Sequence, residues 1–310
     1  MNILYISDMT FDPWVKPLHR YCPDADLFVW GKDEIDAADV DYVLVWKPPA
    51  GVLQNFPNAK AIFNLGAGVD ALLHDPDLPK DIPIVRLVDP RLSSSMAEFI
   101  VYWVLHFHRG MHTYAQQQRA GEWTPHGQGH TEKRRVGILG LGELGQDAAH
   151  ALLMLGFENI AGWSRSRKEL PGIESFAGPA ELDDFLARTE ILVCLLPGTK
   201  ETNGLLNAKT LAKLPKGAFV INSGRGSLIV EDDLIEALNT GQIAAAALDV
   251  FQTEPLPDDH AFWSMDNVFV TPHIASLTDS ESATQIIAEG IEAIEDGDLP
   301  ENVVDLKKGY

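Results

Sequence analysis

A glycine-rich turn lies near the middle of the chain, directly after an apolar run: Val136-Gly137-Ile138-Leu139-Gly140-Leu141-Gly142-Glu143-Leu144-Gly145. A helical segment, Asp147–Leu155, follows it, and a further apolar run begins near residue 159. This order of strand, Gly-x-Gly-x-x-Gly turn, helix and strand is that of a dinucleotide-binding βαβ unit. Gly140 permits the tight turn, Gly142 lets the backbone approach a pyrophosphate, and Gly145 lets helix and strand pack closely. We therefore predict that residues 140–145 bind a dinucleotide at the N-terminus of the helix.

The end of the next predicted strand indicates which dinucleotide binds. An NAD site would carry Asp or Glu there, to bond the ribose hydroxyls. This chain instead has Trp163-Ser164-Arg165-Ser166-Arg167-Lys168, and the first acid is Glu169. Because Ser164, Arg165 and Arg167 can contact a 2′-phosphate, the sequence favours NADPH over NADH. We assign Ser164 to Arg167 to the cofactor site; a basic surface loop is the alternative.

Short runs rich in Val, Ile and Leu alternate with helix-length segments along the whole chain. The runs are Asn2–Ile6, Leu27–Trp30, Tyr42–Val45, Ala61–Asn64, Pro83–Leu87, Arg135–Leu139, Asn159–Trp163, Ile191–Leu195, Ala218–Asn222, Ile243–Asp249 and Asn267–Thr271. Continuous apolar runs are typical of strands buried on both faces of a parallel sheet. Alternation with helices predicts an α/β fold, and the number of strands suits two sheets. We expect two Rossmann/flavodoxin-like parallel-sheet domains with an interdomain cleft.

An apolar helix separates the two series of strands. Apolar residues recur at helical spacing from Met96 to Phe107, and further apolar residues lie off that face, so we expect this helix to be buried on several sides. It is either an interdomain core helix or one that also packs against a second subunit. The following stretch, Met111–Thr131, is polar and predicts an arm or a long loop. We predict a substrate domain of residues 1–97 plus 279–310, to which a last helix near Asp279–Ala293 returns, and a dinucleotide-binding domain of residues 98–278.

Three charged or ionisable residues follow the glycine-rich turn, each at or just after a predicted strand end. Arg225 lies in Asn222-Ser223-Gly224-Arg225-Gly226, Glu254 follows Leu248-Asp249-Val250-Phe251, and His273 lies in Thr271-Pro272-His273-Ile274-Ala275. Ligands of open α/β sheets bind beyond the carboxyl ends of the strands. Each residue alone is weak evidence, but their order and their placement at strand ends point to one site.

These residue types fit the reduction of a 2-keto acid. Arginine can hold the substrate carboxylate by paired charge-assisted hydrogen bonds. Hydride transfer to the carbonyl produces an alkoxide, which needs a proton that a histidine can deliver near neutral pH. A nearby carboxylate raises the pKa of such a histidine and fixes its orientation. We therefore predict Arg225 as the carboxylate anchor and His273, paired with Glu254, as the acid–base residue.

Over nearly its full length the chain resembles the D-isomer-specific 2-hydroxyacid dehydrogenase family. The matching motifs are the turn at Gly140, the three strand-end motifs above with Glu254-Pro255-Leu256, and Asn64-Leu65-Gly66-Ala67-Gly68-Val69-Asp70 in the first half. Within the family it is most similar to the bacterial glyoxylate/hydroxypyruvate reductase A branch, because of residues 164–167 and the loop Trp46-Lys47-Pro48-Pro49. The resemblance implies NADPH-dependent reduction of glyoxylate and hydroxypyruvate, with pyruvate or phenylpyruvate as alternative substrates.

The resemblance also implies roles for single positions. Gly68 with its neighbours Ala67 and Val69 would offer backbone N–H groups to the substrate carboxylate, and Asp249 would bind the nicotinamide carboxamide. Trp46 could narrow the substrate pocket and Lys47 could add a positive charge, or both could be structural. The remaining cofactor positions are Leu141, Glu143, Leu144, Leu196, Pro197, Asn222, Ser223 and Gly224. The family is usually dimeric through the segment that here spans about residues 97–131, so we expect a homodimer.

Composition excludes several other classes of protein. The chain of 310 residues has 24 Lys plus Arg against 45 Asp plus Glu, a formal net charge of −21, which makes a nucleic-acid or anionic-membrane partner unfavourable. Its two cysteines cannot form a disulfide scaffold. The first residues have no basic segment before their apolar stretch, and the longest apolar stretch, Phe99–Leu105, is too short to span a bilayer. We expect a cytoplasmic protein.

Three alternative functions are less favoured by the sequence. A zinc site could use the histidines at positions 106, 108, 112, 126 and 130, but no Cys or Asp completes a tight ligand set, so we predict no metal. A redox-silent NADP(H) sensor would be expected to lack Arg225, Glu254 or His273. A phosphoglycerate dehydrogenase would often carry a further regulatory domain, whereas this chain ends about 37 residues after His273.

Overall fold

The computed structural model describes residues 1–306, which divide into two compact units. Of the described residues, the first unit contains Met1–Leu92 and 278–306, and the second contains Ser93–Leu277. The division falls within helix α3 (Pro90–His108), which also contains the boundary predicted near residue 97.

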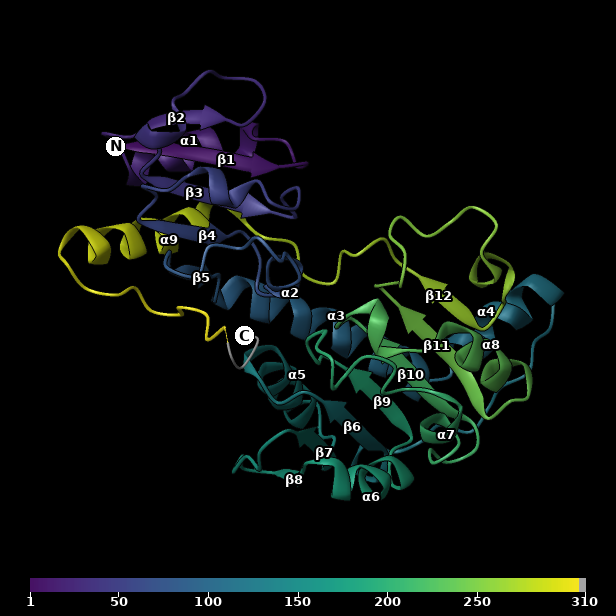
Figure 1. Ribbon diagram of the computed structural model, residues 1–310. Coiled ribbons are helices and arrows are strands. Elements are labelled where there is room, and N and C mark those ends of the chain that lie inside the picture. Colours follow the sequence, from purple (N-terminus) through teal and green to yellow (C-terminus); the bar gives the residue numbers. More distant parts are fainter. Residues whose placement is uncertain (307–310) are drawn as a thin grey trace. The chain divides into compact units, whose positions relative to one another are not determined.

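Five parallel strands form the sheet of the first unit, in the order β2-β1-β3-β4-β5 (Figure 1). The strands are β1 (Asn2–Ser7), β2 (Asp26–Val29), β3 (Tyr42–Trp46), β4 (Ala61–Asn64) and β5 (Ile84–Arg86). The helices are α1 (Asp12–Tyr21), α2 (Asp70–Leu73) and α9 (Ser280–Glu295), with 3₁₀ turns at Ala37–Asp39 and Leu53–Asn55.

Both faces of this sheet are buried. Successive strand residues point to opposite sides, so each strand contributes to two cores. Ile3 and Tyr5 belong to a core that α1 and α9 complete, whereas Leu4 and Ile6 belong to a second core with residues of the 3₁₀ turns and α2. The strands of the first unit are therefore continuous apolar runs because both faces of their parallel sheet are buried, as the sequence analysis expects.

Helix α9 returns to the first unit, within two residues of its predicted bounds. Asp279 caps it by accepting a hydrogen bond from the Ser282 N–H at 2.9 Å. At its other end Glu295 accepts hydrogen bonds from the Lys60 ammonium and the Tyr42 hydroxyl, both at 2.6 Å. These bonds, led by the one from Lys60, lower the pKa of the Glu295 carboxyl.

Seven parallel strands form the sheet of the second unit, in the order β12-β11-β10-β9-β6-β7-β8. The strands are β6 (Arg135–Leu139), β7 (Asn159–Ser164), β8 (Ile173–Ala177), β9 (Ile191–Cys194), β10 (Ala218–Asn222), β11 (Ile243–Leu248) and β12 (Val268–Val270). The helices, besides α3, are α4 (Met111–Ala120), α5 (Glu143–Met154), α6 (Leu182–Ala187), α7 (Ala208–Leu211) and α8 (Glu231–Asn239). The 3₁₀ turns are Thr131–Lys133, Pro179–Glu181, Gly226–Leu228 and Ala261–Ser264.

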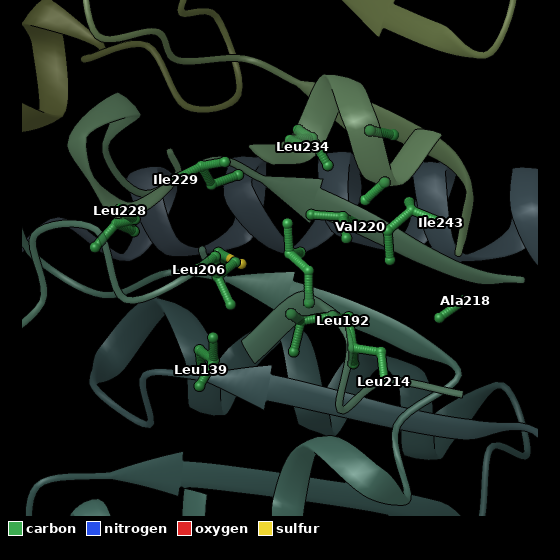
Figure 2. Close-up of a cluster of buried hydrophobic side chains, with 14 of the residues drawn as sticks. Leu139, Leu192, Leu206, Leu214, Ala218, Val220, Leu228, Ile229, Leu234 and Ile243 are labelled. Atoms are coloured by element: carbon green, nitrogen blue, oxygen red, sulfur yellow. The ribbon is translucent and has the colours of Figure 1, made fainter. Parts of the chain in front are cut away.

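The two faces of this sheet also form two cores. Figure 2 shows one of them, in which Leu139, Leu192 and Val220 from three neighbouring strands meet Leu214 and Leu234. The other core holds the opposite strand residues together with α5 and with the apolar face of α3, from Met96 to Phe107. Helix α3 is therefore a core element of the second unit, although Tyr102 on its other side is exposed.

The predicted α/β fold with two parallel sheets is confirmed, and every predicted strand occurs within one residue of its expected ends. Two predictions need correction. Strand β8 was not predicted, because only Ile173 of this edge strand is buried and it therefore has no apolar run. The stretch 111–131 is not a loop throughout, because α4 occupies Met111–Ala120 between Gly110 and Gly121, which both adopt left-handed conformations.

No helix within residues 1–306 is long and apolar enough to cross a membrane.

Candidate functional site

The sheet order of the second unit places its predicted site residues along one edge. The chain runs from β6 outward to β7 and β8, then returns to β9 on the other side of β6, so the direction of strand order reverses between β6 and β9. Ligands of open α/β sheets bind at such a reversal, beyond the carboxyl ends of the strands. The glycine-rich turn follows β6, and the three strand-end motifs follow β10, β11 and β12.

Each of the three glycines of the turn lies where the structure favours glycine, and the cause differs from one to the next. Gly140 has φ +105°, and its N–H donates to the Trp163 carbonyl at 2.9 Å. A Cβ on Gly145 would lie 1.9 Å from the Gly140 carbonyl oxygen, so only glycine allows α5 to begin so close to the turn. Gly142 precedes the helix, and among the described residues other than Gly142 and its two chain neighbours no heavy atom lies within 4 Å of the place its Cβ would take. The turn therefore packs tightly on the sheet side and leaves space beside Gly142.

The residues around the turn fit a bound dinucleotide. The open space beside Gly142 lies at the N-terminus of the twelve-residue helix α5, where N–H groups and the helix dipole favour phosphates. The Ser223 hydroxyl, at the end of β10, is buried and has no hydrogen-bond partner in the described structure. A buried polar atom without a partner is unusual, and a polar ligand at this sheet edge would satisfy it.

His273 and Glu254 form the pair that the sequence predicts. His273 Nδ1 lies 2.8 Å from Glu254 Oε2, and both side chains are partly exposed. Because a carboxylate only accepts hydrogen bonds, Nδ1 carries the proton of this bond, and Nε2 is the nitrogen that can exchange a proton with a ligand. The other Glu254 oxygen accepts the Phe251 N–H at 3.2 Å, which fixes the carboxylate on its own loop.

Asp249 holds the backbone that carries His273. It is 1% exposed, and its carboxylate accepts hydrogen bonds from Thr271 Oγ1 at 2.7 Å and from the Ile274 and Ala275 N–H groups at 2.8 Å each. The His273 N–H donates to the Asp249 carbonyl at 2.9 Å. His273 has φ +55°, a conformation that is strained for a residue other than glycine. The bonds to Asp249 on both sides hold it there.

Arg225 lies in a loop shaped by Asn222. Asn222 accepts the Gly224 N–H at 3.2 Å and donates to the Arg225 carbonyl at 3.0 Å. One guanidinium N–H of Arg225 donates to the Gly224 carbonyl at 2.7 Å. A Cβ on Gly226 would lie 1.9 Å from the backbone of Phe251, so the loop that carries Arg225 packs directly against the loop that leads to Glu254.

The sequence analysis assigns all of Ser164–Arg167, the loop after β7, to the cofactor site. In the structure the side chains of this loop have different partners. Ser164 is buried, and its hydroxyl donates to the Ser166 carbonyl at 2.7 Å. The Arg167 guanidinium donates to the Ser175 carbonyl and to the Glu181 carboxylate. Arg167 thus bonds to β8 and to the turn that follows β8.

The predicted substrate residues of the first unit lie at the ends of adjacent strands. Trp46 ends β3 and packs against Gly66, where a Cβ would lie 2.2 Å from the indole ring. Lys47 has φ +46°, and its ammonium lies 6.0 Å from the centre of the Trp46 ring. Asn64 donates to the Gly66 and Gly68 carbonyls at 2.7 and 3.0 Å, which shapes the loop containing Ala67, Gly68 and Val69. Their role in substrate binding stays a prediction.

The clustered histidines lie in different surroundings. His106 and His112 pack with Phe107, Phe219 and Phe269, and burial lowers the pKa of both imidazoles. His126 lies 2.8 Å from Gln117. Within the described part of the chain, no three His, Cys, Asp or Glu side chains gather as a metal site would require.

Two supporting residues escaped the sequence analysis. Thr271, two residues before His273, bonds to Asp249. Glu231 at the start of α8 accepts the Gln252 N–H at 2.9 Å and lies 3.4 Å from His260 Nε2, so it ties both sides of the Glu254 loop to the helix. Thr271 could have been found from its position at the end of a predicted strand. No sequence signal pointed to the contacts of Glu231.

Comparisons with known proteins agree with this geometry. Residues 101–275 match the family model for the NAD binding domain of D-isomer specific 2-hydroxyacid dehydrogenases. The chain is 41% identical over 316 aligned residues to the glyoxylate/hydroxypyruvate reductase A of Serratia proteamaculans, with both chains fully covered. The relative from Yersinia enterocolitica with the same name is also 41% identical over the full length.

Solved structures show the same similarity. A D-isomer specific 2-hydroxyacid dehydrogenase from Xanthobacter autotrophicus, crystallised with NADPH, is 45% identical with a TM-score of 0.95, over 100% of this chain and 99% of that one. The NADPH-dependent glyoxylate/hydroxypyruvate reductase of Sinorhizobium meliloti, crystallised with NADP and sulfate, is 36% identical with a TM-score of 0.94 and the same coverage. From its sequence and its fold, the chain belongs to the D-isomer specific 2-hydroxyacid dehydrogenase family.

Proposed function

We propose that this protein is an NADPH-dependent reductase of small 2-keto acids, with glyoxylate and hydroxypyruvate as its substrates. The observation that carries the proposal is the 2.8 Å contact between His273 and Glu254, on the same sheet edge as the glycine-rich turn. The relatives from Serratia and Sinorhizobium bear the name of this activity, and the latter structure holds NADP.

Each residue of the pair has a distinct task in the proposed reaction. When bound, NADPH supplies the hydride that adds to the keto carbon. Protonated His273 gives the proton at Nε2 to the carbonyl oxygen, so that a 2-hydroxy acid forms. Glu254 keeps the proton on Nδ1 and stabilises the imidazolium from which the transfer starts. Asp249 and Thr271 hold the backbone that aims the ring.

Arg225 is proposed as the anchor of the substrate carboxylate. A guanidinium has five N–H donors in a planar fork, and its contact with the Gly224 carbonyl uses one of them. Its charge-assisted bonds would hold the keto acid in place while its positive charge favours the alkoxide that develops beside it. Gly140, Gly142, Gly145, Ser223 and the loop after β7 are proposed to hold the dinucleotide.

The test is oxidation of NADPH and of NADH, followed by absorbance, with glyoxylate, hydroxypyruvate, pyruvate and phenylpyruvate in turn. We expect faster turnover with NADPH and with the two small substrates. His273→Ala should lower kcat by about 10²- to 10⁴-fold, and Arg225→Ala should lower kcat/KM by about 100-fold, mainly through KM. His19→Ala, on an exposed position of α1, is the matched control. Unchanged rates in both site variants would exclude the proposed roles.

We further propose that the protein is a homodimer through residues 97–131. After α4 the chain has ten consecutive exposed residues, 121–130, and Trp123 is 98% exposed. This arm is nevertheless fixed, because the His126 N–H donates to the Tyr114 hydroxyl at 2.9 Å and Arg109 donates to Gln128 at 2.5 Å. A tethered arm that presents an indole to solvent is suited to pack against a second copy.

Sedimentation of the wild type and of Trp123→Ser tests the dimer. We expect a wild-type dimer and a weakened association in the variant, whereas Leu299→Ser, at an exposed apolar residue outside the segment, should leave the association unchanged. A monomeric wild type at micromolar concentration would refute the proposal.

A further inference from the structure

Helix α4 has little buried surface. Of its ten residues, all of them described, only Gln117 is buried, and this side chain contacts His126 of the arm rather than the sheet. Arg119 pairs with Asp266 at 3.1 Å, but both side chains are exposed, and exposed ion pairs contribute little to stability. The attachment of α4 to the second unit therefore depends on few side chains, of which His112 is one.

His112 lies in the first turn of α4 and packs on an aromatic cluster of the second unit. The centre of its ring lies 5.2 Å from that of Phe219 in β10, 5.8 Å from that of Phe107 and 6.2 Å from that of His106. The ring of His106, which belongs to α3, lies 4.9 Å from that of Phe269 in β12. The two imidazoles therefore connect α4 to α3 and to two strands of the sheet.

The surroundings of these two imidazoles favour their neutral forms. His106 Nε2 and His112 Nδ1 are both buried, and neither has a hydrogen-bond partner among residues 1–306. Burial lowers the pKa of both imidazoles, and the charge of His106 lowers the pKa of His112 further. Protonation of both would place two positive charges on rings whose centres are 6.2 Å apart in an aromatic cluster.

The side chains that face the two rings from α3, β10 and β12 are aromatic, and Tyr102 is the titratable one among them. His108 and Arg109, which follow in α3, have other partners, namely Phe157 and Gln128. On α4 itself, the ion pair of Arg119 lies at the opposite end of the helix from His112. The described contacts of the two imidazoles thus contain no carboxylate that would stabilise an imidazolium.

We propose that His106 and His112 form a proton-sensitive switch that holds α4, and with it the arm of residues 121–130, on the second unit at neutral pH and releases them in acid. Once α4 is released, each imidazole takes up a proton at its ordinary pKa of 6.5. Because the released state binds more protons, the attachment of α4 is fully stable above pH 6.5 and weakens as pH falls below it. Between pH 7.5 and 5.5, each imidazole that stays neutral in the attached state shifts the equilibrium about 10-fold toward release.

Hydrogen–deuterium exchange of the full-length protein at pH 7.5 and 5.5, corrected for the intrinsic exchange rates, tests the switch. We expect the protection of α4 to fall about 10-fold or more at pH 5.5, while β6 and β9 keep theirs. The double variant of His106→Phe and His112→Phe keeps two aromatic rings without a titratable nitrogen, so its α4 should change by less than about twofold between the two pH values. His150→Phe, at an exposed position of α5, is the matched control and should respond to pH as the wild type does.

Three results would overturn the proposal: unchanged protection of α4 in the wild type, an equal loss in the wild type and the double variant, or a loss that extends to β6 and β9. His112→Gln keeps the test decisive if the double variant does not fold. This variant removes one of the two charges, so its α4 should lose less protection at pH 5.5 than that of the wild type, and a loss as large as in the wild type would also overturn the switch.

Discussion

Asp249 offers the sharpest test of how the fold positions His273, the proposed acid–base residue. Its buried carboxylate accepts three hydrogen bonds, from Thr271, Ile274 and Ala275, all at 2.7–2.8 Å. Asp249→Asn keeps the shape of the side chain but replaces one oxygen by an NH₂ group. Whichever way the amide turns, that group meets at least one backbone N–H of Ile274 or Ala275, so a donor faces a donor.

The expected loss follows from these contacts. A hydrogen bond to a charged group is worth about 1.5–3 kcal/mol, and the bonds that remain lose their charge assistance. Because the site is buried, solvent does not reduce the effect. We expect the free energy of unfolding to fall by about 3 kcal/mol, which for a unit of this size lowers Tm by about 6–12 °C. The strained backbone at His273 should relax, so kcat should fall as well.

Calorimetry gives Tm, and NADPH oxidation with glyoxylate at a temperature where both proteins are folded gives kcat. Asp258→Asn, at an exposed position of the following loop, is the control and should change neither value. If Asp249→Asn melts within about 2 °C of the wild type and keeps its kcat, Asp249 does not hold the His273 loop.

Three further changes test other parts of the structure. Gly226→Ala places a Cβ 1.9 Å from the Phe251 backbone, so it should lower the free energy of unfolding in urea by about 1–3 kcal/mol and lower kcat/KM by shifting Arg225. Gly127→Ala, at a position with open space, should change neither quantity, and equal behaviour of the two variants would refute the close packing of the loops. Glu295→Gln should lower the free energy of unfolding at pH 7 by at most about 1 kcal/mol. Because the pKa of Glu295 is lowered in the folded protein, the difference in unfolding free energy from the wild type should shrink as pH falls below about 4.3. A difference that grows in acid would contradict the assigned bonds. Cys194 is fully buried and burial raises its pKa, and Cys22 is also buried with a raised pKa, so neither thiol should react with a disulfide reagent until urea unfolds the protein; rapid labelling of the native protein would show that these cores open.

Much of the second unit was predictable because its signals are local. Strands buried on both faces are continuous apolar runs, so β6, β9 and β10 could be placed within one residue. Edge strand β8 was missed, since a strand with one buried residue has no such run. Helix α4 was missed because its composition is polar, although the glycines at both of its ends were a usable signal.

From the amino-acid sequence alone we could establish the fold class, the glycine-rich turn and the order of Arg225, Glu254 and His273, because each depends on residue types at fixed short spacing. How these residues are held depends on contacts that form only in the folded chain. Glu181 engages Arg167 from a turn beyond β8, and Asp249 organises residues 271–275 from the neighbouring strand. Such contacts join residues that are distant in sequence, and hydrogen bonds act over about 3 Å, so they exist only once the strands are side by side.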